Sequence, residues 1–404
     1  MIAAFFYDER FTRDASGTYY STGAVPYGAL ARYLEHFDRV VVVGRLGKSS
    51  GATRTVASGE GVEWACIDTS TLSAARYVSV VSRRAREVLA RVDCAIVRMP
   101  GIIGPIASRE ALRIGMPFLA EVAGDAFDAL WNHGSWKGKV AAVPMALLNR
   151  HYIGRALFAT YVTSAALQRR YPPGGKWVAA SNVVIGMPST DVLHRRIARI
   201  DSRVHGATAT LGLVGSYAVD YKGHETALRA LALLLRSGRP VTLRCIGVGD
   251  PSRWRARAEA LGVERNVAFD GALPHGAPVL EWMDGLDVCV VPSLTEGLPR
   301  SLVEAMSRAL PAVGSRVGGI PELLHPRWLH RPGDHRDLAR LVDALLADRE
   351  EMKEQARRNW RAASDYAADV VDARRGSLVR EFKAAIVDQA RAARSRLPNA
   401  ARTS

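Results

Sequence analysis

Cysteines are scarce in this chain of 404 residues, and none of them forms a recognisable motif. Cys66, Cys94, Cys245 and Cys289 each lie in an apolar run, at spacings that match no metal-binding or redox pattern. We therefore expect buried, reduced thiols in a cytoplasmic protein. Long apolar runs are also missing. The uncharged stretch at residues 177–190 is far shorter than a membrane span.

The glycines of a nicotinamide enzyme are missing too. Such an enzyme carries them directly after its first strand, where this chain reads DERFTRDASG. Gly247 and Gly249, with Asp270 roughly 20 residues later, resemble part of a dinucleotide fingerprint, but the third glycine is absent. We interpret these two glycines as a tight strand-to-helix turn.

Acidic residues are outnumbered, with 40 Asp and Glu against 55 Lys and Arg, so the formal net charge is +15. The arginines gather at residues 82–91, 168–176, 193–203 and 391–397. Such clusters indicate attraction to a polyanion: nucleic acid, an anionic bilayer or a phosphorylated substrate. Nucleic acid is the least favoured of these, because aromatic side chains do not alternate with the clusters as a stacking platform requires.

What the chain does contain is an alternation of apolar strand-like runs and amphipathic helical stretches. The strands expected in the first half are 2–7, 39–44, 63–68, 94–98, 117–122, 140–143, 159–163 and 177–185, with helices between them, for instance 25–37, 73–91, 105–114 and 164–171. The strands expected in the second half are 208–214, 241–246, 267–270, 287–292 and 311–314, with helices at 222–236, 251–262, 276–284, 300–309 and 335–347. The predicted fold class is therefore α/β, with two doubly wound, Rossmann-like domains in tandem.

A polar, basic segment separates the two halves and predicts the domain boundaries. We expect domains at 1–186 and 207–370, joined by a linker at 187–206. Residues 371–404 are expected to form a C-terminal helix and tail that can pack back on the first domain.

Two segments that follow strands of the second half could hold an anion. Lys222 and Gly223 open a helix, where a lysine is disfavoured unless an anion lies there too, although a solvated surface lysine is an equal alternative. In TEGLPRSLVEAM, residues 295–306, the helix that starts near Pro299 offers free amides between Glu296 and Glu304. One interpretation is an ordinary strand-to-helix connection. The other is an anion site between two acids that accept hydrogen bonds from ribose and sugar hydroxyls, the arrangement that a nucleotide sugar needs.

The segment EGLPRSLVEAMSRALPAVGSRVGGIPELL resembles the Glu-x7-Glu region of retaining glycosyltransferases of family 4, which have the GT-B fold. VGSYAVDYKGHETALRAL, CIGVGD and GALPHGAPVLEWMDGLDVCVVPS also resemble that family. The resemblance covers most of residues 208–347, whereas the first half resembles the family only in its alternation of strands and helices. It implies two domains that face a central cleft.

The resemblance implies roles for residues of this chain. Glu304 would hold the ribose, Glu296 would contact the donor sugar and Lys222 would neutralise the diphosphate. The backbone at Gly215, Gly297 and Leu298, and around Pro299, would line the donor pocket. The family usually has an arginine where this chain has Ser216, so Lys222 would carry more of the charge unless Arg300 or an arginine of the first domain contributes.

The first domain would supply the acceptor side and a polar residue near the donor. Asp125 is the first candidate for that residue and Glu121 the second, with His133 further along the chain; Asp125 could equally cap the following helix. Gly17 could bring the first loop close to the phosphates.

The resemblance implies transfer of a sugar with retention, in which the leaving diphosphate takes the acceptor's proton. Since no two aspartates are spaced Asp-x-Asp, we expect no metal and no cofactor besides the nucleotide-sugar substrate. We expect a nucleoside diphosphate sugar as donor, UDP favoured over GDP, and a glycan or lipid-linked acceptor in bacterial polysaccharide or glycoconjugate biosynthesis.

The alternatives are a natural-product glycosyltransferase, an epimerase or phosphorylase of the same fold, and an inactive nucleotide-sugar-binding scaffold. The expected location is the cytoplasm, with peripheral, salt-sensitive binding to an anionic membrane face through residues 82–91 and 168–176.

Overall fold

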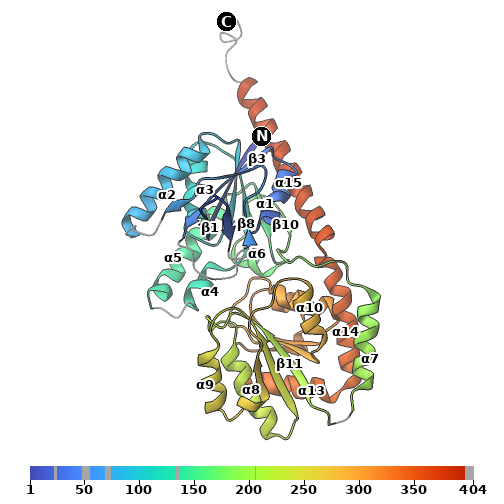
Figure 1. Cartoon of the computed structure of the whole chain (residues 1–404). Helices are drawn as coiled ribbons and strands as arrows, with labels where there is room; N and C mark the ends of the chain where they lie inside the picture. The colour runs from blue at the N-terminus through green and yellow to red at the C-terminus, as the bar shows by residue number, and fades with distance from the viewer. Residues whose placement is uncertain (22–24, 48–54, 69–73, 133–135, 205, 396–404) are drawn as a thin grey trace, which may run out of the picture.

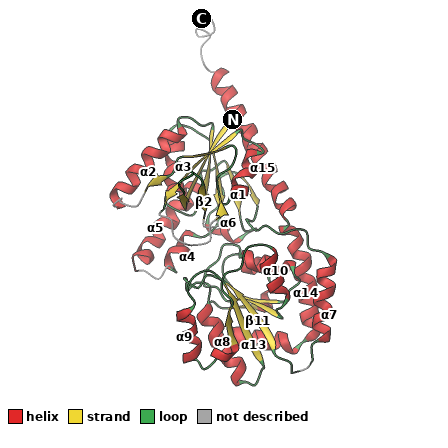
Figure 2. Ribbon diagram, viewed as in Figure 1, coloured by secondary structure: helices red, strands yellow, loops and turns green. Residues whose placement is uncertain are grey.

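The computed structural model describes residues 1–21, 25–47, 55–68, 74–132, 136–204 and 206–395. Figure 1 shows two α/β domains stacked end to end, with the last long helix running along the upper one. Figure 2 shows the strands of each domain gathered in a central sheet that helices flank. The fold is GT-B, as the sequence predicts.

The N-terminal sheet is built around six parallel strands in the order β3-β1-β7-β8-β9-β10. Their bounds are β1 (Ile2–Arg13), β3 (Arg39–Leu46), β7 (Cys94–Met99), β8 (Phe118–Val122), β9 (Phe158–Tyr161) and β10 (Lys176–Ala179). The short strands β2 (Tyr19–Ser21), β4 (Thr55–Val56), β5 (Val62–Trp64) and β6 (Ile67–Asp68) extend it beside β1 and β3.

Side chains of β1 alternate between the two faces of this sheet, as a strand covered on both sides requires. Ala4 and Phe6 belong to the core under α2 (Ala74–Leu89) and α3 (Ile103–Arg113). Ala3 and Phe5 belong to the core under α1 (Tyr27–Leu34) and α15 (Ala368–Ser395). The C-terminal helix therefore forms part of the N-terminal domain's core.

The C-terminal sheet has six parallel strands in the order β13-β12-β11-β14-β15-β16. Their bounds are β11 (Ala209–Val214), β12 (Val241–Ile246), β13 (Val267–Phe269), β14 (Val288–Val291), β15 (Ala312–Ser315) and β16 (Leu329–His330). Successive strands add outward from β11 on one side and then outward from β14 on the other. The crevice between β11 and β14 is thus the point where the strand order reverses, and ligands of open parallel sheets bind there.

Helices α8 (His224–Arg236), α9 (Ser252–Ala260), α10 (Ala277–Asp284), α11 (Arg300–Ser307), α12 (Ile320–Leu323), α13 (His335–Ala347) and α14 (Arg349–Ala363) complete the second domain. Helices α8, α9, α10, α11 and α13 agree closely with those expected from the sequence. In the segment expected to link the domains, α7 (Thr190–Ser202) is a helix whose buried Arg196 donates hydrogen bonds to the carbonyl oxygens of Met283 and Leu286. The segment therefore packs on the second domain.

The expected strand at 140–143 is wrong, because these residues lie inside α5 (Trp136–Ile153). A four-residue apolar run fits a strand or a helix equally well, and here the following Met, Ala and Leu residues continue a helix. Helix α5 pairs with α4 (Ala126–Trp131) on the side of the sheet opposite to α15 (Figure 1). α6 (Ala166–Arg170) lies after β9.

The three cysteines Cys94, Cys245 and Cys289 are buried, but Cys66 is partly exposed; all four are unpaired. Burial raises the pKa of the Cys66 and Cys289 thiols to about 12. The thiols are therefore protonated at neutral pH.

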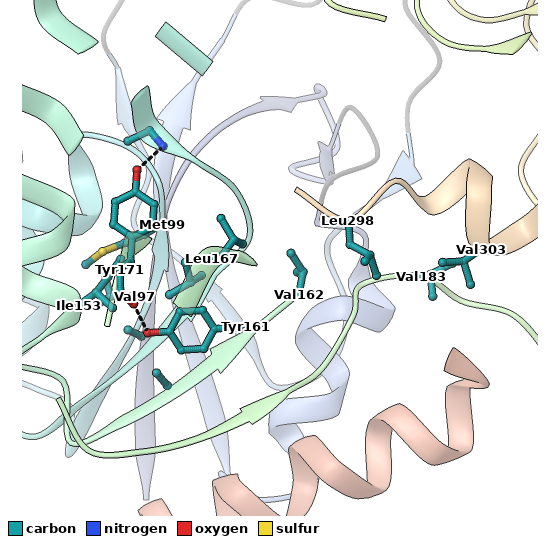
Figure 3. Packing of buried hydrophobic residues seen from close by; sticks show 14 of the residues in the cluster. Val97, Met99, Ile153, Tyr161, Val162, Leu167, Tyr171, Val183, Leu298 and Val303 are labelled. Atoms are coloured by element: carbon teal, nitrogen blue, oxygen red, sulfur yellow. Dashed lines mark hydrogen bonds between the residues drawn. The ribbon is translucent and has the colours of Figure 1, made fainter. Parts of the chain in front are cut away.

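One apolar cluster crosses the domain boundary. Val162, Leu167 and Val183 share it with Leu298 and Val303 of the second domain, as Figure 3 shows. The two domains thus contact each other through an apolar patch beside the loop that precedes α11.

Candidate functional site

A cavity of about 280 Å³ lies between the domains. Helices α4 and α6 form its upper wall, and the loops after β14 and β15 form its lower wall. Its lining residues are Asp125, Asp128, Ala166, Leu167, Arg170, Leu294, Glu296, Arg316, Val317 and Gly318. The cavity thus adjoins the carboxyl ends of the C-terminal strands.

Lys222 and Glu296 meet at this end of the sheet although they are 74 residues apart. Lys222 follows β11 and Glu296 follows β14, so they flank the point where the strand order reverses. Lys222 Nζ lies 2.7 Å from Glu296 Oε1, and Ser293 Oγ donates to the same oxygen at 2.8 Å. The side chains are 21% and 9% exposed, so the pair forms a charge-assisted contact shielded from most of the solvent.

Glycines allow the loops of the site to approach each other closely. Gly223 has φ of 79°, and a Cβ there would lie 2.1 Å from the carbonyl oxygen of Pro292. A Cβ on Gly297 would lie 2.7 Å from the carbonyl oxygen of Ala123 in the first domain, and one on Gly318 would lie 1.9 Å from that of Glu296. Larger residues at these positions would force the loops apart and displace Lys222 or Glu296.

The amino end of α11 follows Gly297 directly. Pro299 is its N-cap and has no N–H, while the first amides of the helix, from Arg300 on, have no carbonyl partner one turn back. Leu298 turns its side chain into the interdomain cluster, which leaves only its backbone for a ligand. Arg300 is exposed.

Glu304 lies just over one turn inside α11 and outside the set of residues that line the cavity. Burial raises the pKa of this carboxyl, while the positive charges of Arg300 and His275 lower it to a smaller extent. These two charges belong to α11 itself and to the loop after β13.

Asp125 lines the cavity and also caps α4, since its Oδ1 accepts a hydrogen bond from the Asp128 amide at 3.0 Å. Arg170 forms ion pairs with both Asp125 and Asp128. Tyr171 adds a hydrogen bond to Asp125 Oδ1 at 3.1 Å. Asp125 is thus a fixed carboxylate on the first domain's side of the cavity.

The second choice for that place, Glu121, is wrong. Its side chain is buried within the N-terminal domain and pairs with Arg32 at 2.9 Å, while Tyr33 donates to it at 3.1 Å. Burial opposes its ionisation, but Arg98 and Arg32 outweigh burial and lower the pKa of Glu121 to about 2. This carboxylate holds β8 against α1. His133 lies outside the described residues.

The remaining predicted residues lie in tight turns. The amide of Gly215 donates to the Ile246 carbonyl, and Ser216 Oγ donates to that of Val248 at 3.1 Å. Gly17 has φ of 89° in the turn between β1 and β2, where its nearest neighbours are the guanidinium atoms of Arg13. The contacts described for Gly17 are thus within its own hairpin.

The sequence did not identify three charged residues of the cavity: Asp128, Arg170 and Arg316. Arg170 belongs to the arginine cluster at residues 168–176, but nothing in that segment indicates that Arg170 lies across the cavity from Glu296. Arg316 directly follows β15, a position that points to the ligand edge of a parallel sheet. Arg316 adds positive charge to the cavity, whereas the charge of Arg170 is paired with Asp125 and Asp128.

Within the described residues, no group of three or more His, Cys, Asp or Glu side chains is arranged to hold a metal ion. A search of the same residues finds no helix with the length and apolarity to cross a membrane.

Comparison with protein families finds a match to glycosyl transferases group 1 over residues 208–348. The chain is 29% identical over 376 residues to protein CapJ of Staphylococcus aureus, and the alignment covers 92% of this chain and 93% of CapJ. It is 35% identical over 143 residues to 2-deoxystreptamine glucosyltransferase of Streptomyces kanamyceticus, covering 34% of this chain and 36% of that protein. It is 34% identical over 131 residues to the amylovoran biosynthesis glycosyltransferase AmsK of Erwinia amylovora, covering 30% and 32%.

Two solved structures have the same fold. Sucrose-phosphate synthase from Thermosynechococcus elongatus superposes with a TM-score of 0.66 at 16% identity, over 95% of this chain and 100% of that one. Anabaena HepE in complex with UDP-glucose superposes with a TM-score of 0.61 at 17% identity, over 95% and 100%. Residues 208–348 therefore match the group 1 glycosyltransferase family, and the chain as a whole has the GT-B fold of these solved structures.

Proposed function

We propose that the chain is a retaining glycosyltransferase that moves a sugar from a UDP-sugar to an acceptor hydroxyl and needs no metal ion. The observation that carries this proposal is the Lys222–Glu296 pair. A half-buried cation and a carboxylate meet beside the amino end of α11, at the reversal of strand order. The structure of HepE with UDP-glucose supports UDP-glucose as the first donor to test.

The donor would lie along α11. Its diphosphate would accept hydrogen bonds from the amides that open the helix and face the ammonium of Lys222. Its ribose would contact Glu304, and its sugar would enter the cavity beside Glu296. Arg316 would supply positive charge that the residue at Ser216 does not.

In the proposed reaction, the acceptor oxygen bonds to the anomeric carbon as the bond from that carbon to the β-phosphate oxygen breaks. The acceptor's proton passes to a phosphate oxygen of the leaving UDP on the same face, so that configuration is retained. The protein's contribution is position and charge: Lys222 stabilises the diphosphate as negative charge develops on it.

The acceptor is proposed to be a growing glycan or a lipid-linked sugar in polysaccharide biosynthesis, as the similarity to AmsK supports. A natural-product acceptor is the second candidate, because the similarity to a 2-deoxystreptamine glucosyltransferase is of the same extent.

The test combines calorimetry with UDP and UDP-glucose and an assay for UDP release from UDP-glucose. Lys222→Gln is expected to lower UDP release about 10²- to 10³-fold, since it removes a charge that acts on the leaving group. Lys176→Gln is the matched control, because Lys176 forms an exposed ion pair with Glu381 far from the cavity. That control should keep its rate within about twofold.

The outcomes separate the alternatives. UDP release that a chelator leaves unchanged supports the metal-independent mechanism. Binding of UDP without turnover of UDP-glucose or of a panel of other UDP- and GDP-sugars indicates an inactive scaffold. If neither nucleotide nor any sugar nucleotide binds, the proposal is wrong.

A further inference from the structure

Most of the large apolar side chains of α5 are exposed to solvent, and three of its four buried residues are small or polar. Trp136, Val140, Val143 and Leu147 are spaced four, three and four residues apart and so lie on one face of the helix. Three of them are 72%, 68% and 61% exposed, namely Trp136, Val140 and Leu147. The face of an ordinary surface helix that carries such residues packs against the core.

The side of α5 that is buried carries Gly138, Ala142, Asn149 and Ile153. The exposure is not confined to one residue. All four residues of the apolar stripe are more than half exposed in the described part of the chain. An exposed stripe of this kind marks an interaction surface.

The stretch of sequence that contains this stripe carries charged residues of one sign. Between Asp128 and Asp191 the sequence contains no acidic residue, and it contains seven cations. These are Lys137, Lys139, Arg150, Arg155, Arg169, Arg170 and Lys176. Lys137, Lys139 and Arg150 belong to α5 itself, and all three are exposed.

An open groove of about 410 Å³ lies beside the stripe. Phe127 of α4 and Val143 and Leu147 of α5 form apolar walls, and the groove also contacts three arginines: Arg150, Arg169 and Arg170. Arg170 lines the interdomain cavity as well, so the groove opens next to the candidate active site.

A row of rings and cations connects the stripe to that cavity. Lys139 Nζ lies 5.8 Å from the ring centre of Trp131, which stacks on Phe127 at 5.2 Å. The guanidinium of Arg170 lies 5.9 Å from the ring centre of Phe127. A partner bound to α5 would therefore lie at a fixed place relative to the cavity.

We propose that the α4–α5 surface, formed by Trp131, Trp136, Val140, Val143 and Leu147 with Lys137 and Lys139, docks on an anionic lipid bilayer. An apolar stripe bordered by cations, with tryptophans at its end, suits the interface between head groups and acyl chains. A second copy of the chain fits less well, because a two-fold contact would bring the same cations together. The groove and the cavity beside it then face the lipid surface.

The test is co-sedimentation of the full chain with vesicles of phosphatidylcholine alone and of equal parts phosphatidylcholine and phosphatidylglycerol. The wild type should bind the anionic vesicles, and added salt should weaken this binding. Val140→Ser with Leu147→Ser should weaken it about tenfold or more, and so should Lys137→Gln with Lys139→Gln. The matched control is Ile114→Ser with Val204→Ser, which removes two exposed apolar side chains elsewhere and should bind like the wild type.

Thermal unfolding of all variants should match the wild type, because the changed side chains are exposed. The proposal is overturned if the wild type ignores anionic vesicles, if the control loses as much binding as the α5 variants, or if only the charge changes matter. It is also overturned if the wild type is a dimer that Val140→Ser with Leu147→Ser dissociates. UDP release without vesicles should be unchanged in the α5 variants, so vesicle binding and catalysis are tested separately.

Discussion

At the scale of single residues, the candidate site contains two acids in different surroundings. Glu296 accepts hydrogen bonds from Lys222 and Ser293. Glu304 is partly buried, and this burial raises the pKa of its carboxyl, while Arg300 and His275 lower it to a smaller extent. We expect the raised pKa of Glu304 to appear in the dependence of stability on pH.

Because burial raises the folded-state pKa of Glu304, the folded chain binds this proton more tightly than the unfolded chain. The resulting stabilisation is fully present below the unfolded pKa, and it is lost as pH rises through the folded pKa. Glu304→Gln removes this loss. The free energy of unfolding of the wild type should therefore fall relative to that of the variant as pH rises from about 4 to neutrality.

Urea unfolding at a series of pH values measures this difference. Glu281→Gln in α10 controls for the loss of an exposed carboxylate. A wild-type-to-variant difference that stays constant with pH, or grows in favour of the wild type, would contradict the prediction.

The sequence drew attention to these two acids because both lie on one short segment, where the spacing within a helix decides their relative positions. Lys222 followed from the same reasoning about what comes after a parallel strand. Arg170 and Asp128 could not be predicted in this way, since their proximity to Glu296 depends on how one domain rests on the other. Glu121 was chosen for its position at the end of β8, but two arginines inside the domain hold it.

At the scale of elements, α15 belongs to the second half of the sequence but to the first domain in space. Phe382 is fully buried and contacts Phe158 of β9, with ring centres 5.5 Å apart. Lys383 donates to the His36 carbonyl, and Gln389 donates to that of Gly115. The helix thus covers one face of the N-terminal sheet.

Phe382→Ala is expected to lower the free energy of unfolding by about 3–5 kcal/mol, since it removes a large ring from a closed core. Ser377→Ala on the exposed side of the same helix should change it by less than about 0.5 kcal/mol. Circular dichroism during denaturant unfolding gives both values. Equal stability of the two variants would mean that α15 is not part of the folded core.

Elements with a clear period were predicted closely, as α13 and β12 illustrate. Helix α5 was not, because most of its large apolar residues are exposed and three of its four buried residues are small or polar. If apolar residues are assumed to be buried, such a segment is predicted to be a strand. The same exposure is what marks the helix as a docking surface.

At the scale of the whole molecule, one side chain joins the two domains. The Glu322 carboxylate of α12 accepts hydrogen bonds from the backbone amides of Ser164, Ala165 and Ala166, at 2.6, 3.0 and 2.6 Å. The Ser164 hydroxyl donates to it as well, at 2.9 Å. A carboxylate of the second domain thus caps the first turn of α6 in the first.

Glu322→Ala is expected to lower the free energy of unfolding by about 1–3 kcal/mol, because it leaves these donors without their acceptor. It should also raise the radius of gyration in small-angle scattering as the domains separate. Glu350→Ala is the control, since Glu350 pairs with Lys353 at the surface. Stability and scattering equal to those of the wild type would contradict a role for Glu322 in holding the domains together.

The chain passes between the domains twice, and the two passages lie side by side. Ile185 and Ala367 form a parallel bridge, and the Ala368 amide donates to the Ile185 carbonyl at 2.9 Å. In Figure 1 this junction is on the α14 and α15 side, whereas α4 lies on the opposite side. Because the paired passages lie at one edge of the interface, separation of the domains at the α4 edge would break the Glu322 contacts and the shared apolar cluster but would leave the connecting backbone in place.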